Sequence, residues 1–440
     1  MGLRFTTRRA VLGLLCLALL VRLGFMIGAV GFHGAVRGDE INYQDHAANL
    51  AAGKGFVDAD GRPTAARPPL LPVVLAGLYR LFGTRVEVGR LFQVLVGVAV
   101  VGLTYLVAAR LFSAEIGLVA AALVAINPYL VFISSYLLTE NLYTVLLLAT
   151  VFAIARDGGL QSAGIWTWVV AGCLIGLASL TRPNAVFLAV LVAPAMLFWG
   201  RGTALSRLVK VGALALAIAV TIAPWAVRNH AKLGSWVLFT THGGITFYQS
   251  NNRLVCDDPA LYGSVAPRES LPGWEAIHSA KELEGDKLAW SYARAFLREN
   301  PRLVPKLAAE KMLRFWRLRS HAPWSGVKSG WWWNKSLVLG NLASRFDFGI
   351  VYASVVFPFA LVGLVVTGRA YRELYVLYAV IAVHVLVALA FYGSLRARIP
   401  IEPVIAAFAS VGAARVYFMV RRARSGRSGS DARRLEVGCS

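Results

Sequence analysis

Apolar segments long enough to cross a membrane recur along the chain, and most polar connections between them are short. A helix needs about 20 consecutive apolar residues to span a bilayer. Hydropathy along the 440 residues therefore predicts an all-α integral membrane protein with about ten transmembrane helices. The predicted spans are 10–32, 88–110, 116–134, 140–155, 165–181, 184–200, 207–226, 347–366, 373–391 and 399–420.

The apolar segment at 69–83 is shorter, with only about 13 residues dominated by apolar side chains. Segments of this length are typical of helices that lie at the membrane surface. If 69–83 does not cross and the N-terminus is cytoplasmic, the short basic connections and the C-terminus also fall in the cytoplasm, as is usual. These connections carry Arg110, Arg156, Arg201, Arg207, Lys210, Arg369 and Arg372.

The first apolar segment, 10–32, has some features of a secretory signal peptide. Its apolar part runs for about 23 residues, longer than the usual 7–15-residue signal core. We therefore expect an uncleaved first helix. Arg22 within it either extends to the membrane surface or faces a polar interior.

The spans divide the chain into four parts. Residues 1–227 form an N-terminal transmembrane region with an external loop at 33–87, 228–346 an extracytoplasmic loop region, 347–420 the C-terminal transmembrane helices, and 421–440 a basic cytoplasmic tail. In the long loop, apolar residues at helical spacing predict amphipathic helices, broken at "ENPRLVP". These helices and the aromatic cluster at 330–334 either anchor the loop to the outer leaflet or line a channel for a lipid phosphate.

Composition agrees with a membrane protein, because 57% of the residues are hydrophobic and only 15% are charged. The formal net charge of +22 comes from arginines scattered between apolar segments. They form no continuous basic face, so we expect membrane lipids as partners and no nucleic acid. The cysteines have no spacing typical of a metal site or a disulfide framework; they are Cys16, Cys173, Cys256 and Cys439.

Two adjacent carboxylates, Asp39 and Glu40, follow the first helix in "RGDEINYQDH". One can act as a general base on an acceptor hydroxyl, while the other orients it or holds a divalent cation. Alternatively, the pair only caps the following helix. Tyr43, His46 and His242 are candidate substrate contacts. The two histidines can also bind metals, but no tight ligand spacing supports a metal site.

More charged residues fall on the same predicted side of the membrane. Glu140 begins an apolar helix, where an acid is costly unless it is paired, catalytic or a helix cap. Arginines at outer helix ends either extend to the surface or bind a phosphate through two hydrogen bonds. The arginine candidates are Arg182, Arg228, Arg396 and Arg398, with an internal ion pair to Glu402 as the alternative for the last two. His384, in the middle of a span, is expected to pack in the core.

Several stretches resemble the GT-C glycosyltransferases, and in particular the group of protein O-mannosyltransferases and aminoarabinose–lipid A transferases. The resemblance runs in family order from the first helix to about residue 415. It is carried by "GDEINYQDHAANLAAGKGF", "ARPPLLPVVLAGLYRLFG", "SYLLTENLY", "GLASLTRPNAVFL" and "RARIPIEPVIA". It implies a GT-C fold and a membrane enzyme of the cell envelope. Such an enzyme transfers a sugar from a polyprenyl-phosphate donor to a lipid, glycan or protein acceptor on the extracytoplasmic side.

The resemblance also implies roles for the candidate residues. Asp39 matches the family's catalytic aspartate with Glu40 beside it, and Glu140 matches a second acidic position. Arg228, Arg396 and Arg182 are then the contacts of the donor phosphate, with Arg398 beside them. One branch of the family has a metal-holding acid just before its proline pair, where this sequence has Ala66 and Arg67. No cofactor is therefore clearly implied, and a divalent cation stays an open alternative.

Two other functions stay open from the sequence. One is a transporter or flippase of polyprenyl-linked lipids, and the other is an inactive structural subunit of an envelope glycan assembly complex. Transporters bind substrate near the membrane midplane through broken helices and repeated halves. Here the helix centres are nearly free of acids and no internal repeat is visible, which favours the enzyme.

Overall fold

A computed structural model describes residues 2–316 and 348–425. In these ranges every predicted span coincides with a helix or a pair of helices, and no strand occurs, apart from an isolated bridge between Val57 and Pro63. The long apolar helices are α1 (Gly2–Phe25), α4 (Val86–Leu111), α5 (Ala114–Ile126), α7 (Glu140–Arg156), α9 (Ile165–Ser179), α10 (Val186–Trp199), α11 (Ala204–Leu233), α18 (Phe348–Val366), α19 (Tyr375–Ala390) and α21 (Glu402–Ser425).

Four described segments are long and apolar enough to cross a membrane by length and composition: Thr7–Val30, Val86–Leu111, Ala204–Leu233 and Leu395–Arg424. The other apolar helices are shorter, so the number of ten crossings stays a prediction. The outward surface of the long and the shorter apolar helices alike is strongly apolar, as expected where lipid replaces water. Leu20, Phe198, Leu216 and Val365 are 68%, 80%, 65% and 81% exposed.

The predicted span 116–134 is divided in the structure, because the helix stops at Asn127. The side chain of Asn127 accepts hydrogen bonds from the backbone N–H groups of Tyr129 and Leu130, and Pro128 has no N–H to continue the preceding helix. Helix α5 therefore ends at Ile126, and a short helix α6 (Pro128–Ile133) begins at once. Asn-Pro is a local stop signal that hydropathy does not register.

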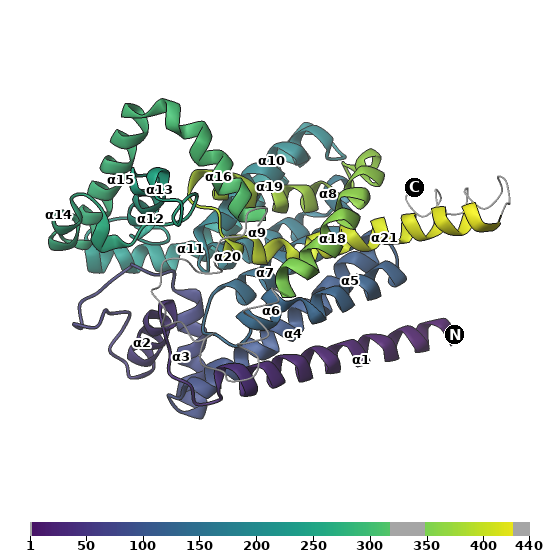
Figure 1. Ribbon diagram of the computed structural model, residues 1–440, viewed down its shortest axis with the longest axis horizontal. Helices are drawn as coiled ribbons and strands as arrows, with labels where there is room; N and C mark the ends of the chain where they lie inside the picture. Colours follow the sequence, from purple (N-terminus) through teal and green to yellow (C-terminus); the bar gives the residue numbers. More distant parts are fainter. Residues whose placement is uncertain (1, 317–347, 426–440) are drawn as a thin grey trace.

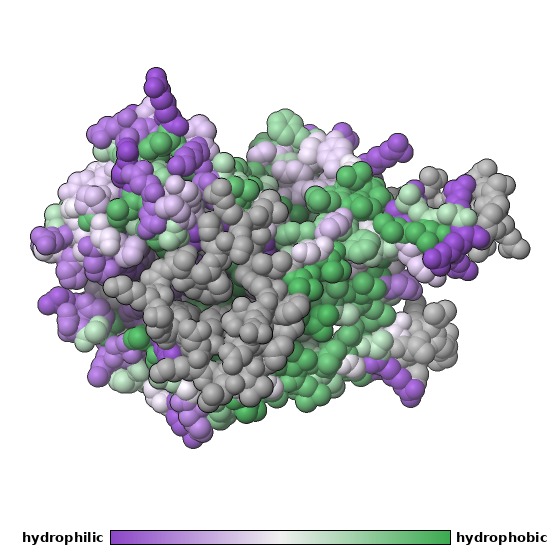
Figure 2. Space-filling view, in the orientation of Figure 1, coloured by the Kyte–Doolittle hydropathy of each residue, from purple (hydrophilic) through white to green (hydrophobic). Residues whose placement is uncertain are grey.

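The N-terminal end of α1 and the C-terminal end of α21 lie at the same end of the helix bundle (Figure 1). At the opposite end lie α2 (Asp39–Ala51), α3 (Leu70–Phe82), α12 (Gly243–Ser250), α13 (Leu254–Asp257), α14 (Trp274–Ser279) and α15 (Glu282–Glu299). Hydrophobic surface lies over α5 and α18, between this hydrophilic end and the hydrophilic tips opposite (Figure 2). This distribution agrees with a bundle that sits in a membrane and carries a polar layer at one end.

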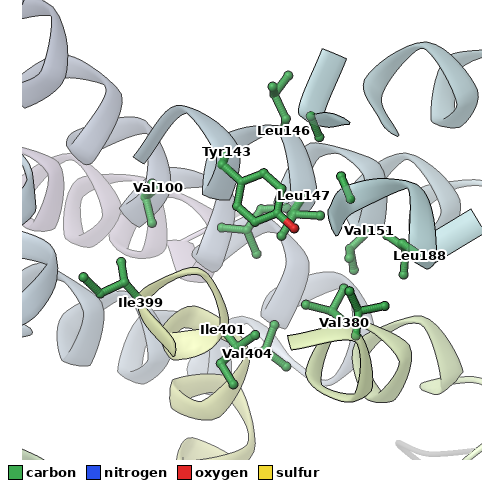
Figure 3. Close-up of a cluster of buried hydrophobic side chains, with 14 of the residues drawn as sticks. Val100, Tyr143, Leu146, Leu147, Val151, Leu188, Val380, Ile399, Ile401 and Val404 are labelled. Carbon is green, nitrogen blue, oxygen red and sulfur yellow. The ribbon is translucent and has the colours of Figure 1, made fainter. Parts of the chain in front are cut away.

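The centre of the bundle is packed with aliphatic side chains from α4, α7, α10, α19 and the start of α21 (Figure 3). Tyr143 of α7 lies among them, and its hydroxyl accepts a hydrogen bond from the Asn184 side chain at 3.0 Å. His384 is also buried, and its Nδ1 pairs with Val380 O at 2.8 Å, as a packed core histidine would.

Helices α18 and α21 approach closely enough for their backbones to touch. A Cβ atom built on Gly363 would lie 1.9 Å from Phe408 O, and one built on Gly412 would lie 1.9 Å from Phe359 O. Small residues on facing helices are a common packing device in membrane proteins. The two glycines therefore fix how these helices cross.

Arg22 of α1 faces the protein interior and is fully buried. Its guanidinium donates to Ala125 O at 3.1 Å and to Val124 O at 3.3 Å, which are carbonyls in the last turn of α5. A cation at a helix C-terminus is favourable because it pairs with unsatisfied carbonyls and with the helix dipole. Of the two alternatives for Arg22, the structure adopts the interior one.

The long loop contains a second apolar core, formed by Tyr248, Leu261, Ile277, Ala289 and Leu307 among others. The predicted amphipathic helices are α15 and α16 (Val304–Trp316), and the chain breaks between them at Asn300, before Pro301. The aromatic cluster at 330–334 lies outside the described residues.

Lys311 joins α16 to the helix bundle although its side chain is only 1% exposed. Its Nζ donates to Asn251 Oδ1 at 2.8 Å, to Ala390 O at 3.0 Å and to Leu389 O at 3.2 Å. The two carbonyls are at the end of α19, so Lys311 fastens the loop core to the segment that leads into Arg396.

Candidate active site

Five charged side chains from five separate segments form a continuous chain of ion pairs at the polar end of the bundle. Arg67 Nη2 lies 2.8 Å from Asp39 Oδ1, and Arg396 Nη1 lies 2.9 Å from Asp39 Oδ2. Arg396 Nε lies 2.8 Å from Glu140 Oε1, and Arg182 Nη1 lies 2.9 Å from the same oxygen. We call these residues the ion-pair chain.

Local structure explains how each acid comes to its place. Asp39 is the first residue of α2 and Glu140 the first residue of α7, so each carboxylate lies at the positive end of a helix dipole. Gly38 before Asp39 has φ 56°, a conformation that favours glycine. The chain can therefore turn sharply from the first helix into α2.

The arginines come from three connections. Arg67 lies in the loop before α3, Arg182 follows the end of α9, and Arg396 belongs to the short helix α20 (Leu395–Arg398). A guanidinium presents several N–H groups in one plane, so Arg396 can bind two carboxylates at once. Among the described residues, Arg396 alone forms ion pairs with both acids.

The ion-pair chain is closed at one end and open at the other. The Glu140 side chain is fully buried, whereas that of Asp39 is 36% exposed. The three arginine side chains are between 17% and 23% exposed. An incoming molecule therefore meets Asp39 and the arginines first, and three positive charges face two negative ones.

The electrostatic environment keeps Asp39 ionised. Burial alone would raise the pKa of the Asp39 carboxyl, but the guanidinium groups of Arg396 and Arg67 outweigh it and hold that pKa well below its usual range. Both carboxylate oxygens are engaged by an arginine. Asp39 in this arrangement is a weak base.

Arg268 extends the positive charge beyond Arg67 and contacts His242. Arg268 Nη2 lies 2.7 Å from His242 Nε2, and because a guanidinium can only donate, the imidazole accepts and is neutral. Burial and the charges of Arg67 and Arg268 lower the pKa of His242 to about 3. His242 thus lies beside the site, held by an arginine.

Tyr43 packs under the site. Its side chain is 6% exposed, and the guanidinium carbon of Arg67 lies 5.9 Å from the centre of its ring. A ring at this distance favours a cation through its π face. Burial raises the pKa of the Tyr43 hydroxyl, so it stays protonated.

Other candidates from the sequence lie outside the ion-pair chain. Glu40 accepts hydrogen bonds from the backbone N–H groups of Arg37 and Leu137. His46 pairs through Nδ1 with Val57 O at 2.8 Å and stacks on Phe56 with ring centres 4.4 Å apart. Neither side chain has a described contact with the arginines of the ion-pair chain.

Two candidate arginines also have other partners. Arg228 donates to Thr64 O at 2.7 Å and to Phe56 O, which holds the segment between α2 and α3 to the end of α11. Arg398 is fully buried and pairs with Glu402 at 2.7 Å. For Arg398 the structure therefore has the internal ion pair.

Sequence reasoning gives no role in the site to Arg67, which pairs with Asp39, or to Arg268, which contacts His242. Arg67 precedes a proline pair, and its position there is the one signal that the sequence offers. Arg268 begins a short 3-10 helix, Arg268–Ser270, and no sequence motif surrounds it. Only the folded chain brings it to His242.

The described residues do not fit a divalent-cation site. Within 2–316 and 348–425, no three His, Cys, Asp or Glu side chains come together in a way that could hold a metal. A divalent cation prefers carboxylate oxygens, but both oxygens of Asp39 and one oxygen of Glu140 already pair with guanidinium groups.

The arrangement of the helices matches that of solved structures. The apo crystal structure of an oligosaccharyltransferase from Archaeoglobus fulgidus matches with a TM-score of 0.52 at 13% identity, over 97% of this chain and 54% of that one. The same enzyme with zinc and sulfate matches with a TM-score of 0.51 at 14% identity, over 92% and 49%. The fold is that of the GT-C membrane glycosyltransferases, and the chain spans about half the length of these structures.

Part of the chain is also similar in sequence to the protein mannosyltransferases. Residues 66–226 match the family model described as dolichyl-phosphate-mannose-protein mannosyltransferase. ArnT from Cupriavidus metallidurans bound to undecaprenyl phosphate matches with a TM-score of 0.47 at 18% identity, over 91% of this chain and 78% of that one. Comparison with curated proteins finds no match. The chain is a membrane protein.

Proposed function

We propose that this protein transfers a sugar from a polyprenyl-phosphate donor to an acceptor at the extracytoplasmic face of the membrane. The observation that carries the proposal is the ion-pair chain, in which Arg396 bridges Asp39 and Glu140 at 2.9 Å and 2.8 Å. The match of residues 66–226 to the mannosyltransferase family model supports the same reaction class.

The charge of the site suits the departing group. A sugar phosphodiester carries one negative charge, and the lipid phosphate released from it gains further charge as the glycosidic bond breaks. Three arginines against two acids leave a net positive charge, and Arg268 adds another beside Arg67. Interactions that strengthen as charge develops lower the barrier.

In this mechanism the arginines bind the donor phosphate, and Asp39 takes the proton of the acceptor. Arg67 or Arg396 must first shift from Asp39 to the phosphate, because a carboxylate paired with two guanidinium groups is a poor base. The donor therefore activates Asp39 as it binds. Attack by the acceptor then displaces the lipid phosphate directly, with inversion at the sugar carbon. Glu140 keeps Arg396 and Arg182 in place.

The proposal also includes the orientation and the organisation of the chain. In it, the polar end with α2, α3 and the loop core faces the outside, both termini are cytoplasmic, and the chain divides into four parts at 227, 346 and 420. The acceptor is a lipid, a glycan or a protein. The Lys/Arg-rich connections at the opposite end of the bundle support this orientation.

The test is an assay of purified protein in lipid nanodiscs with radiolabelled polyprenyl-phosphate sugars and envelope extracts as acceptor. The wild type should transfer label, and Asp39→Asn should abolish transfer while still binding polyprenyl phosphate. Asp45→Asn is the matched control, because Asp45 is an exposed acid on the same helix. Equal turnover of Asp39→Asn and wild type would falsify the role of Asp39. Translocation of donor across a liposome membrane without transfer would instead identify a flippase.

A further inference from the structure

Glu40 lies between the two chain segments that carry the acids of the site. Its Oε1 accepts a hydrogen bond from Leu137 N at 2.9 Å, and its Oε2 accepts one from Arg37 N at 3.2 Å. Arg37 is two residues before Asp39, and Leu137 is three residues before Glu140. One carboxylate thus joins the start of α2 to the turn that leads into α7.

The two acids need this spacing because a single guanidinium bridges them. Arg396 reaches Asp39 through Nη1 and Glu140 through Nε, so the two carboxylates must lie within the width of one planar group. A shift of either segment by about 1 Å would break one of the pairs, since hydrogen bonds weaken steeply beyond their normal range.

Glu40 occupies this position at a cost. Its side chain is 2% exposed, and burial raises the pKa of its carboxyl, while the hydrogen bond from Leu137 opposes that shift. A buried carboxylate is retained only where it is well paired. The charge of Arg90, which is also fully buried, and that of Arg37 favour the ionised form of Glu40.

We propose that Glu40 is a positioning residue that holds the Asp39 segment against the Glu140 segment, so that Arg396 can bridge both acids. It does not itself touch the substrate. This inference rests on the proposed function for its effect on activity, but the connection between the two segments can be tested without it.

Two substitutions separate a positioning role from a role for the charge. Glu40→Gln loses the charge but keeps the length, so its carbonyl oxygen still accepts from Leu137, whereas its NH2 group cannot accept from Arg37. Glu40→Asp keeps the charge but is one methylene shorter, so it cannot reach Leu137 and Arg37 together. If Glu40 positions the site, Glu40→Gln should be the more active variant. If its charge takes part in the chemistry, Glu40→Asp should be.

We expect kcat to fall by no more than about tenfold in Glu40→Gln and by about 100-fold in Glu40→Asp. A displacement of about 1 Å can lower the rate by about 100-fold. In Glu40→Asp the acidic limb of the kcat–pH profile should also move to higher pH, because Asp39 loses contact with Arg396. A residue that only stabilised the fold would leave this limb unchanged. Asp45→Asn should behave as wild type in every measurement.

Hydrogen–deuterium exchange gives the readout that is independent of activity. The Leu137 amide should exchange at least about tenfold faster in Glu40→Asp than in wild type and at nearly the wild-type rate in Glu40→Gln. If Glu40→Asp does not fold, faster exchange of the Arg37 amide in Glu40→Gln with Leu137 still protected supports the proposal. Unchanged Leu137 exchange in Glu40→Asp, or an Arg37 amide as slow in Glu40→Gln as in wild type, overturns it. So does a Glu40→Asp variant more active than Glu40→Gln. A wild type without transfer refutes the proposed function alone, and exchange then decides on Glu40.

Discussion

Arg396 Nη1 contacts Asp39 Oδ2 at 2.9 Å, although the two residues are 357 positions apart in the sequence. The same guanidinium contacts Glu140 at 2.8 Å. This bridge joins three distant segments at the polar end of the bundle, and it is the basis of the first prediction.

Replacing Arg396 by lysine should lower kcat by about 100-fold, although the charge is kept. An ammonium is a compact point charge and cannot present two N–H groups in the plane that Asp39 and Glu140 require. Transfer assays at saturating donor measure the effect. The control is Arg110→Lys, because Arg110 is an exposed arginine in the last turn of α4. Wild-type kcat in Arg396→Lys would show that the bridge is dispensable.

Removing Arg67 should move the acidic limb of the kcat–pH profile to higher pH. The pKa of Asp39 is held low by Arg396 and Arg67 against the effect of burial, so losing one guanidinium raises it. A base is active only above its own pKa. As the pH is lowered, Arg67→Gln should therefore lose activity at a higher pH than the wild type does.

The control for this experiment is Arg62→Gln in the same segment between α2 and α3, where the Arg62 side chain is 77% exposed. Its profile should coincide with that of the wild type. An acidic limb that stays in place in Arg67→Gln would mean that Asp39 is not the group that titrates.

Lys311 should make the stability of the protein increase with pH above neutrality. Burial lowers the pKa of Lys311 from 10.5 to about 7. Between these values the unfolded chain binds a proton that the folded chain does not, so the free energy of unfolding rises with pH across that window. Below about pH 7 the buried ammonium carries its full desolvation cost.

The measurement is the unfolding temperature in detergent at several pH values for the wild type and Lys311→Met. The difference between the two curves should change across the window, because other groups titrate equally in both proteins. Cys256, whose pKa is raised by burial, is the other titratable group that acts on Lys311. If the unfolding temperatures of the wild type and Lys311→Met changed in parallel with pH, Lys311 would not be the group responsible for the pH dependence.

Substituting Gly412 by alanine should destabilise the protein by about 1–3 kcal/mol, the usual cost of overpacking. The added methyl group would lie 1.9 Å from Phe359 O, where the backbone of α18 cannot yield easily. Thermal unfolding in detergent measures this.

Gly212→Ala in α11 is the matched control, because no atom lies within 4 Å of a Cβ built at Gly212. It should leave the unfolding temperature unchanged or raise it slightly, as alanine is the better helix former. Equal unfolding temperatures of Gly412→Ala and Gly212→Ala would show that α18 and α21 do not cross as closely as described.

Much of the fold follows from hydropathy, because each apolar segment must bury its backbone polar groups in a helix. The length of the apolar segment at 69–83 is enough to predict the short helix α3, Leu70–Phe82. Hydropathy does not predict the break at Asn127, because a hydropathy window does not register an Asn side chain that caps the next helix. The number of membrane crossings does not follow from helix length in the same way, since four described segments are long enough to cross and the other apolar helices are shorter.

The sequence also indicates which residues share the polar end, and the structure brings Asp39, Glu140, Arg182 and Arg396 into direct contact. The sequence does not indicate which neighbouring residue each charged side chain contacts. Arg396 and Arg398 are two positions apart, yet one bridges the site and the other pairs with Glu402 in the core. Such choices depend on helix rotation and on partners hundreds of residues away.

The position of Arg396 has a consequence for biosynthesis. Asp39, Arg67, Glu140 and Arg182 all precede residue 200, whereas their bridging partner is synthesised more than 200 residues after Arg182. Nascent chains that do not yet contain α20 therefore hold the two acids without the bridge from Arg396. The ion-pair chain can form only after the ribosome has made α20, so its assembly is a late event in the biosynthesis of the protein.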